Sequence, residues 1–203
     1  MTPSDEAAAW DSIYAGRAWG RWPHEGLVRA FCRLAAGRSR LQVLDVGCGP
    51  GANLVFLERE GHDAHGIDLS KVAIAQAAER LTDAGFAPRL TVGSVMKLPF
   101  RDGSFDVATE VEVLTYVVGM DVAWAEIARV LRPAGRVISV AFGSRCDPAL
   151  MSYLRGCQPL EAGEMAALAE RAGLIPIEQQ VQMRTQGPEH RWIEEIITVA
   201  ARA

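Results

Sequence analysis

Short apolar runs separated by amphipathic stretches dominate the chain from residue 41 to residue 142. Five of these runs are short, rich in apolar residues and bounded by turn signals, which favours strands. They lie at residues 41–46, 63–69, 88–94, 105–111 and 135–142. Helical spacing of apolar residues predicts helices at residues 52–60, 70–85 and 120–131. Strands that alternate with helices predict a parallel sheet covered on both faces.

The C-terminal part departs from this alternation. A helix pattern at 161–173 precedes two strand patterns at 175–183 and 191–201, which only the short segment RTQGPEH separates. Parallel neighbours need a crossover of about a dozen residues or more. We therefore expect the last two strands to pair antiparallel, as a hairpin at the edge of the sheet.

The N-terminal part predicts two helices split by the loop-like segment GRAWGRWPHEG. Ser4 is a plausible N-cap of the first helix, and the second helix places Leu27, Phe31 and Leu34 on one face. Farther along, Ser70 is expected to cap the helix at 70–85, and Gly85 to follow its end.

Composition narrows the class of protein. The chain has 203 residues, 49% of them hydrophobic, so one domain over 1–203 can bury a core without staples. A net charge of −4 gives no global positive field for nucleic acid or anionic membrane. The four cysteines lack metal-site spacing, so we expect reduced thiols, a cytoplasmic protein and no metal. We expect neither a signal peptide nor a membrane span.

A glycine-rich turn follows the first strand of the sheet. The stretch from Gly47 to Ala52 reads GCGPGA and satisfies the dinucleotide-binding pattern G-x-G-x-x-G/A between a strand and a helix. Asp68 closes the next strand, where a partner for ribose hydroxyls is expected. Spacing alone leaves a nicotinamide enzyme and another nucleoside binder nearly tied.

Charge separates these two alternatives. Asp45 lies two positions ahead of the turn, and Glu110 and Glu112 end the fourth strand at the same edge of the sheet. Two unit charges about 4 Å apart interact by roughly 4 kcal/mol at an effective dielectric constant near 20. Asp45 would therefore oppose a pyrophosphate and favour a nucleoside that carries a cationic tail.

Three blocks of the sequence carry a family resemblance. They read VLDVGCGPGANLVFLEREGHDAHGIDLS, GSVMKLPFRDGSFDVATEVEVLTYV and EIARVLRPAGRVISVAF. Together they resemble class I S-adenosylmethionine-dependent methyltransferases over residues 41–143, and both ends resemble small stand-alone bacterial members. The resemblance implies a Rossmann-like α/β three-layer sandwich with seven strands, mostly parallel, and an antiparallel C-terminal hairpin. Residues 1–40 would form a helical lid and 144–203 the C-terminal helix and hairpin.

The resemblance also implies where the cofactor S-adenosylmethionine would bind, leaving S-adenosylhomocysteine as product. Gly47, Gly49 and Gly51 would lie under it, with Asp45 near its amino-acid end. Asp68 would accept the ribose hydroxyls. The remaining expected cofactor contacts lie beside the turn and after the second, third and fourth strands: Cys48, Asn53, Leu69, Ser94, Val95, Met96, Glu110 and Val111.

One position departs from the family pattern. Many relatives have Gly-Asp-Ala where this chain has Gly93-Ser94-Val95. The Asp of those relatives meets the adenine amino group. Here the adenine contact would depend on Ser94 and on packing around Val95 and Met96.

Methyl transfer is an in-line displacement in which the protein holds the acceptor about 3–3.5 Å from the methyl group and excludes water. The expected catalytic residues are Glu112, His24 and Tyr14. The lid would also carry Trp19 and Trp22, and Tyr14 and Trp22 would contact the sulfonium through their rings. His24 and Glu112 are candidate bases.

Further residues could form the acceptor pocket. Tyr116 follows the fourth strand, and the segment 147–160 is expected to form part of the substrate wall. Arg145 and Arg184 could face an acidic substrate, although surface arginines are common.

We expect an EC 2.1.1.- methyltransferase that acts on a small molecule, as a monomer or homodimer, without nucleic acid or membrane. The tetrapeptide typical of amino-methylating nucleic-acid enzymes is absent after the fourth strand, which reads EVEVLTY. A tRNA or other nucleic-acid methyltransferase, a nicotinamide oxidoreductase and a non-catalytic S-adenosylmethionine-binding protein remain the alternatives.

Overall fold

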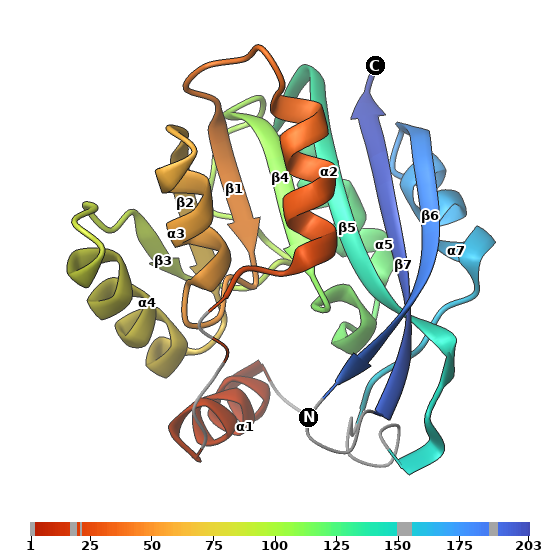
Figure 1. The fold of residues 1–203 in the computed structure, drawn as a ribbon, viewed down its shortest axis with the longest axis horizontal. Helices are drawn as coiled ribbons and strands as arrows, with labels where there is room; N and C mark the ends of the chain where they lie inside the picture. The colour runs from red at the N-terminus through yellow and green to blue at the C-terminus, as the bar shows by residue number, and fades with distance from the viewer. Residues whose placement is uncertain (1–2, 17–19, 21, 150–155, 187–190) are drawn as a thin grey trace.

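A seven-stranded sheet in the order β3-β2-β1-β4-β5-β7-β6 forms the middle layer of the molecule (Figure 1). The computed structural model describes residues 3–16, 20, 22–149, 156–186 and 191–203. The first five strands run parallel, and β7 pairs antiparallel with both β5 and β6. The strands are β1 (Gln42–Val46), β2 (Asp63–Asp68), β3 (Leu90–Val92), β4 (Phe105–Val111), β5 (Leu131–Cys146), β6 (Leu174–Gln186) and β7 (Arg191–Arg202).

Helices cover both faces of the sheet. On one face, α2 (Glu25–Ala35), α3 (Ala52–Arg59) and α4 (Lys71–Asp83) pack through Leu27, Leu54 and other buried residues. On the other face, α5 (Met120–Val130) and α7 (Ala162–Arg171) enclose a second core around Trp124. Successive residues of β1 enter opposite cores, as in a strand that is buried on both faces.

The first helix lies apart from these layers. α1 (Pro3–Gly16) crosses the edge of the sheet at which the arrow of β1 ends (Figure 1). Carboxyl ends of parallel strands bind ligands in this kind of fold. The short 3-10 helix η1 (Leu114–Tyr116) follows β4 at the same edge.

The predicted architecture is confirmed. The parallel strands, the intervening helices and the antiparallel hairpin all lie where the pattern predicted them. Ser70 caps α4 by accepting a hydrogen bond from the Ala73 amide at 3.1 Å, and Gly85 follows the helix with a φ of 87°. On α2, Leu27 and Phe31 are buried and Leu34 is partly buried.

Several boundaries differ from the prediction; β3, for example, is shorter than the range 88–94. β5 begins at Leu131 rather than Gly135, because Leu131 already pairs with Phe105 before an irregularity in the register. β6 continues to Gln186, since its last three residues pair with the start of β7. Ser4 does not cap the first helix, which begins at Pro3 and so includes Ser4 in its first turn.

None of the helices in the described ranges combines the length and the apolar character that a bilayer crossing requires.

Candidate functional site

The glycine-rich turn between β1 and α3 takes a conformation that favours glycine. Gly47, Gly49 and Gly51 have φ values of 64°, 50° and 81°, a region that other residues rarely adopt. A Cβ atom at Gly47 would collide with the side chain of Val113, and one at Gly51 would lie 3.0 Å from the Cβ of Ala77. The turn is therefore packed against the segment after β4 on one side and against α4 on the other.

Asp68 ties the end of β2 to this turn. Its Oδ2 accepts a hydrogen bond from the Gly49 amide at 2.9 Å, and its Oδ1 accepts one from the Ser70 amide at 2.8 Å. Burial raises the pKa of the Asp68 carboxyl, against the lowering effect of these backbone hydrogen bonds. Each oxygen retains capacity for a further donor, because an ionised carboxylate has about four acceptor sites.

Asp45 presents an unsatisfied oxygen beside the turn. The residue is 1% exposed, and its Oδ1 accepts a hydrogen bond from the Thr109 hydroxyl at 2.7 Å. Its Oδ2 is buried without a hydrogen-bond partner among the described residues. Burial raises the pKa of Asp45 to about 7, and the neighbouring carboxylates Asp68 and Glu110 add to the rise. A buried carboxylate in this state favours a ligand that brings a donor or a positive charge.

Glu110 shapes the turn that follows β4. It is buried, accepts a hydrogen bond from the Ser139 hydroxyl, and accepts others from the amides of Val113 at 3.3 Å and Leu114 at 3.2 Å. Burial raises its pKa to about 7, although these hydrogen bonds act in the opposite direction. Because its oxygens serve the protein itself, Glu110 fixes the position of Val113, which packs on Gly47.

α1 covers the turn from outside. Asp11 accepts hydrogen bonds from the Ser70 hydroxyl at 2.6 Å and from the Val72 amide at 3.2 Å, which fastens α1 to the start of α4. Tyr14 is buried, and its hydroxyl lies 3.2 Å from where a Cβ of Gly49 would be. The ring of Trp10 stands edge-on to Tyr116, with centroids 5.3 Å apart. Burial raises the pKa of Tyr14, so its hydroxyl stays protonated and can donate a hydrogen bond.

A charged cluster lies at the start of α2 and consists of His24, Glu112, Arg184 and Glu195. His24 Nε2 lies 3.0 Å from Glu195 Oε1 and 3.9 Å from Glu112 Oε1. Arg184 Nη2 donates to Glu112 Oε1 at 2.5 Å, and Arg184 Nε donates to Glu195 Oε1. The four residues come from the start of α2, the end of β4 and the two strands of the hairpin, which meet only in the folded chain.

Three residues of the same cluster are of types that can bind a metal ion. His24, Glu112 and Glu195 each offer a donor atom, and these atoms all lie within 4.8 Å of one another. The guanidinium of Arg184 already contacts both carboxylates and supplies a positive charge there. The expectation that the protein uses no metal stays a prediction.

The structure gathers most of the predicted cofactor residues around the turn. The Gly93 amide donates a hydrogen bond to the Asp68 carbonyl at 2.8 Å. This bond holds the segment 93–96 beside the end of β2. In that segment the Ser94 hydroxyl accepts a hydrogen bond from the Met96 amide at 3.2 Å. Cys48 and Val95 are buried, whereas Leu69 and Val111 are partly buried.

Other predicted residues have different surroundings. Trp22 is 82% exposed, so its ring is not packed into the site in this conformation, and its contact with the sulfonium stays a prediction. Asn53 accepts a hydrogen bond from the His24 amide at 3.0 Å and thereby positions the start of α2. Arg184 is not an isolated surface arginine, because it is paired within the charged cluster. Trp19 lies outside the described residues.

The expected substrate wall is described only in part, since residues 150–155 lie outside the described ranges. Its end lies beside the site: the Gln158 amide donates to the Thr115 carbonyl at 2.6 Å, and the Leu160 amide donates to the Phe142 carbonyl at 3.0 Å. Arg145 pairs with Glu194, with Nε 2.7 Å from Oε1.

Sequence reasoning missed Asp11, Trp10 and Glu195. Glu195 left one signal, because a pair of acids inside the apolar run WIEEIITVAA implies a buried charge that needs a partner. Asp11 and Trp10 left none, since their roles depend on where α1 docks.

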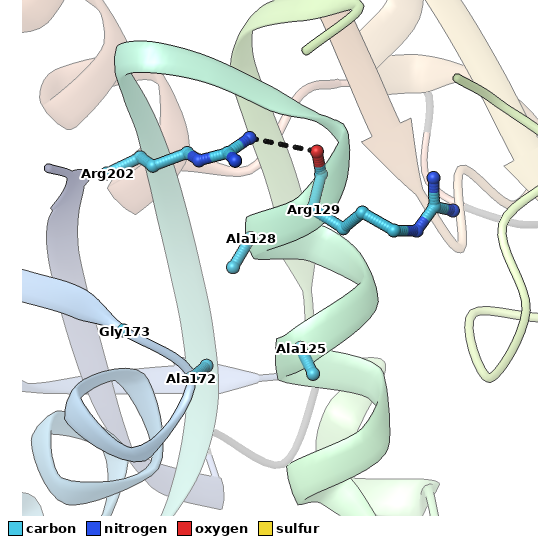
Figure 2. A pocket seen from close by; sticks show the side chains of 6 residues that line it. All are labelled: Ala125, Ala128, Arg129, Ala172, Gly173 and Arg202. Carbon is cyan, nitrogen blue, oxygen red and sulfur yellow. Dashed lines mark hydrogen bonds between the residues drawn. The ribbon is translucent and has the colours of Figure 1, made fainter. Parts of the chain in front are cut away.

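A shallow pocket lies at the opposite edge of the sheet and does not belong to the site. Small residues of α5 and of the end of α7 line it with Arg129 and Arg202 (Figure 2). Figure 2 shows the guanidinium of Arg202 turned to the backbone carbonyl of Arg129, to which it donates at 2.9 Å.

Comparisons with known proteins agree with this geometry. A family model described as a methyltransferase domain matches residues 44–139. Methyltransferase GfsG of Streptomyces halstedii is 30% identical over 162 residues, which cover 72% of this chain and 58% of that protein. The chain thus spans little more than half the length of this relative.

Two solved structures share the fold. The 1,6-didemethyltoxoflavin-N1-methyltransferase of Burkholderia thailandensis matches with a TM-score of 0.73 and 20% identity over 100% of this chain and 91% of that one. The [4+2]-cyclase SpnF matches with a TM-score of 0.77 and 19% identity over 100% and 97%. Together with the glycine-rich turn, its acidic partners and the sheet order, these matches show that the chain has the fold of these proteins and that its residues 44–139 are similar to a methyltransferase domain.

Proposed function

We propose that this protein transfers the methyl group of S-adenosylmethionine to a small-molecule acceptor. The observation that carries the proposal is the buried, unpartnered Oδ2 of Asp45 beside a glycine-rich turn. A cationic nucleoside would satisfy that oxygen, whereas a pyrophosphate would be repelled by it. GfsG carries the name of a methyltransferase, and the toxoflavin enzyme was solved with 1,6-didemethyltoxoflavin and S-adenosylhomocysteine bound.

The residues present fit this cofactor. Asp68 would accept the ribose hydroxyls with the acceptor capacity that Gly49 and Ser70 leave free. Asp45 would face the amino-acid end, and the turn from Gly47 to Gly51 would let the backbone approach the nucleoside closely. The adenine would lie against Leu69 and the segment 94–96.

The cofactor would supply a methyl group made electrophilic by its bond to a positively charged sulfur. The chain's own residues would bind, orient and exclude water. Tyr14 and the rest of α1 cover the turn, and the hydrogen bonds of Glu110 hold the segment after β4 in place. Such positioning accounts for most of the catalysis that the protein must provide in an in-line displacement.

We further propose the following context for this activity. The chain would act as a single methyltransferase domain in the cytoplasm, as a monomer or homodimer, and without nucleic acid. A net charge of −4 supports the last point, because nucleic-acid binding depends on basic surfaces. The described structure has four free cysteines, which agrees with a reducing compartment.

Calorimetry with S-adenosylhomocysteine tests the cofactor assignment. Wild-type protein should bind it, and Asp68→Ala should weaken the affinity by about tenfold or more, since hydrogen bonds to a charged group contribute about 1.5–3 kcal/mol. Asp83→Ala serves as the matched control, because Asp83 is an exposed acid at the far end of α4. Equal binding by wild type and Asp68→Ala would remove the assignment, as would binding of NADH in its place.

Transfer itself needs a separate measurement. Methyl-labelled S-adenosylmethionine mixed with a metabolite extract should label a small molecule in the presence of wild-type protein. Label found only in added tRNA would favour the nucleic-acid alternative. Binding of the cofactor with no transfer to any acceptor would favour a non-catalytic binding protein.

A further inference from the structure

The two carboxylates of the charged cluster, Glu195 and Glu112, have different surroundings. Glu195 is fully buried, and its oxygens accept hydrogen bonds from His24, Arg184 and Gln182. Burial alone would raise the pKa of Glu195, but the hydrogen bonds and positive charge from His24 and Arg184 lower it to about 2. Glu195 is therefore ionised at neutral pH and joins the hairpin to the start of α2.

Glu112 is held at one oxygen only. Its contacts with His24 and Arg184 both use Oε1, and no hydrogen bond within the described ranges engages Oε2. The side chain is 25% exposed, in contrast to the enclosed Glu195. Burial raises the pKa of Glu112 in spite of Arg184 and His24, so this carboxylate can take up a proton more readily than an ordinary glutamate.

The backbone aims Glu112 at the site. Its φ is 58°, a left-handed conformation that is rare for a residue with a side chain and that concentrates at functional sites. The Glu112 amide donates to the Val140 carbonyl at 2.7 Å, which holds this conformation. The next residue, Val113, packs on Gly47 of the glycine-rich turn, so Glu112 stands between the proposed cofactor position and the hairpin.

The two ring nitrogens of His24 are less accessible to an acceptor than the free oxygen of Glu112. Nε2 faces Glu195, and Nδ1 is buried without a partner in the described part of the chain. The geometry thus favours Glu112 over His24 as the base, because Glu112 has an oxygen that no described residue engages.

We propose that Glu112 is the general base for the acceptor, that Arg184, Glu195 and His24 are its positioning residues, and that the acceptor is a group with a dissociable O–H or N–H. This inference rests on the proposed methyl transfer. As the acceptor's oxygen or nitrogen bonds to the methyl carbon, the carbon–sulfur bond breaks and its electron pair goes to sulfur. The acceptor's proton passes to Glu112 Oε2 and then to solvent, which balances the charge lost by the sulfonium.

Titration of Glu112 tests the positioning. Groups from every packed element act on its charge: His24, Glu110, Cys146, Cys157, Arg184 and Glu195. Carboxyl NMR of protein labelled with ¹³C at glutamate Cδ follows the residue, and Glu112→Gln identifies its signal. Arg184→Gln should raise the pKa of Glu112 by about one unit and Glu195→Gln should lower it by about one unit, because they remove an attractive and a repulsive charge.

A matched control and a folding check accompany this titration. Arg33→Gln removes an arginine of α2 that pairs with Glu178 of β6 at 2.9 Å. This pair lies near the end of α2, whereas His24 and the rest of the charged cluster lie at its start. It should leave the pKa of Glu112 unchanged. Unmoved titration in both Arg184→Gln and Glu195→Gln, in variants that still bind S-adenosylhomocysteine, would overturn the positioning role. If wild type does not bind that ligand, the proposed function fails separately.

Turnover tests the base and the acceptor class. The panel comprises phenols, whose attacking oxygen carries a dissociable proton, and pyridines and tertiary anilines, whose attacking nitrogen carries none. Label should enter only the proton-bearing acceptors, and Glu112→Gln should lower kcat by about 10²–10⁴-fold with little change in KM. His24→Ala should have a smaller effect. Methylation of the proton-free acceptors, or unchanged turnover by Glu112→Gln, would overturn the proposal.

Discussion

The carboxylate of Asp68 accepts a hydrogen bond from the backbone amide of Gly49 at 2.9 Å, and this bond joins the end of β2 to the turn after β1. The two strands are parallel neighbours, so their carboxyl ends meet at one edge of the sheet. Ser70 donates to the other oxygen and begins α4, to which α1 is fastened. Asp68 therefore links the end of β2 to the glycine-rich turn and, through Ser70, to the helix α1 that covers the turn.

The first prediction concerns the contact of α1 with α4. Asp11→Ala removes the acceptor for the Ser70 hydroxyl and the Val72 amide, so α1 should dock less firmly over the turn. We expect the affinity for S-adenosylhomocysteine to fall by roughly three- to tenfold, measured by calorimetry, because ordering α1 would then cost conformational entropy on binding. Asp11→Asn keeps one acceptor oxygen and should lose less.

The pH dependence of this contact has a definite sign. The hydrogen bonds from Ser70 and Val72 lower the pKa of Asp11 from 3.8. The stabilising contribution is therefore present above pH 3.8 and is lost as the pH falls through the lower folded value. At neutral pH the ligand affinity of wild type and of Asp11→Ala should differ by a constant factor, and identical affinities would contradict the docking role of Asp11.

Local sequence patterns were sufficient for the sheet but not for every part of the site. Strands such as β1 and β4 are apolar runs between turn signals, and parallel pairing alone brings Asp45, Asp68 and Glu110 to one edge. The hydrogen bond from Thr109 to Asp45 follows from the register of β1 against β4, in which these two residues are partners.

The remaining part of the site depends on tertiary structure. Arg184 meets Glu112, 72 positions away in the sequence, only because the hairpin adds to β5 in one particular register. His24 reaches Glu195 because the amide of His24 is held by Asn53 on α3. The family resemblance implied an N-terminal lid that includes Trp22, but a resemblance in sequence does not determine which ring turns inward, and Trp22 is exposed.

The second prediction compares two glycines in different surroundings. A Cβ at Gly66 would lie 2.6 Å from Leu54 Cδ1 and 2.8 Å from Cys48 Sγ, both within the core beside the turn. Gly66→Ala should lower the free energy of unfolding by about 1–3 kcal/mol through overpacking. Gly163, within α7, has nothing within 4 Å of its Cβ position, and Gly163→Ala should raise that free energy by about 0.5–1 kcal/mol. Urea unfolding of both variants measures the difference, and a stabilising Gly66→Ala would contradict the packing.

The third prediction concerns Arg202, at the pocket opposite the site (Figure 2). Its guanidinium donates to the carbonyls of Arg129 and Leu131, which are left without helical partners where α5 ends. Arg202→Ala should lower the free energy of unfolding by about 1–2 kcal/mol and leave the affinity for S-adenosylhomocysteine unchanged. Both hydrogen bonds come from Nη1, so Arg202→Lys, which retains the charge but not the planar guanidinium, should recover part of the loss. A large loss of affinity in a folded Arg202→Ala would contradict the separation of the pocket from the site.

The last prediction follows from the buried carboxyl of Asp45, whose pKa is about 7. Because this folded value lies above the ordinary 3.8, protonated Asp45 favours the folded protein below pH 3.8, and that contribution is lost as the pH rises through about 7. A cationic ligand should favour the ionised form and lower this pKa. Binding of S-adenosylmethionine should therefore tighten by up to about tenfold between about pH 6 and 8, with release of a proton.

Calorimetry in two buffers with different ionisation enthalpies measures both the affinity and the proton release. Asp45→Asn should abolish the pH dependence, because an amide does not titrate. Glu110→Gln is the informative comparison: the pKa of Glu110 is also about 7, but its oxygens accept hydrogen bonds from Ser139 and from the turn after β4 rather than facing the ligand. If the pH dependence vanished with Glu110→Gln and survived in Asp45→Asn, the cation would be recognised by Glu110, and Asp45 would serve only to join β1 to Thr109.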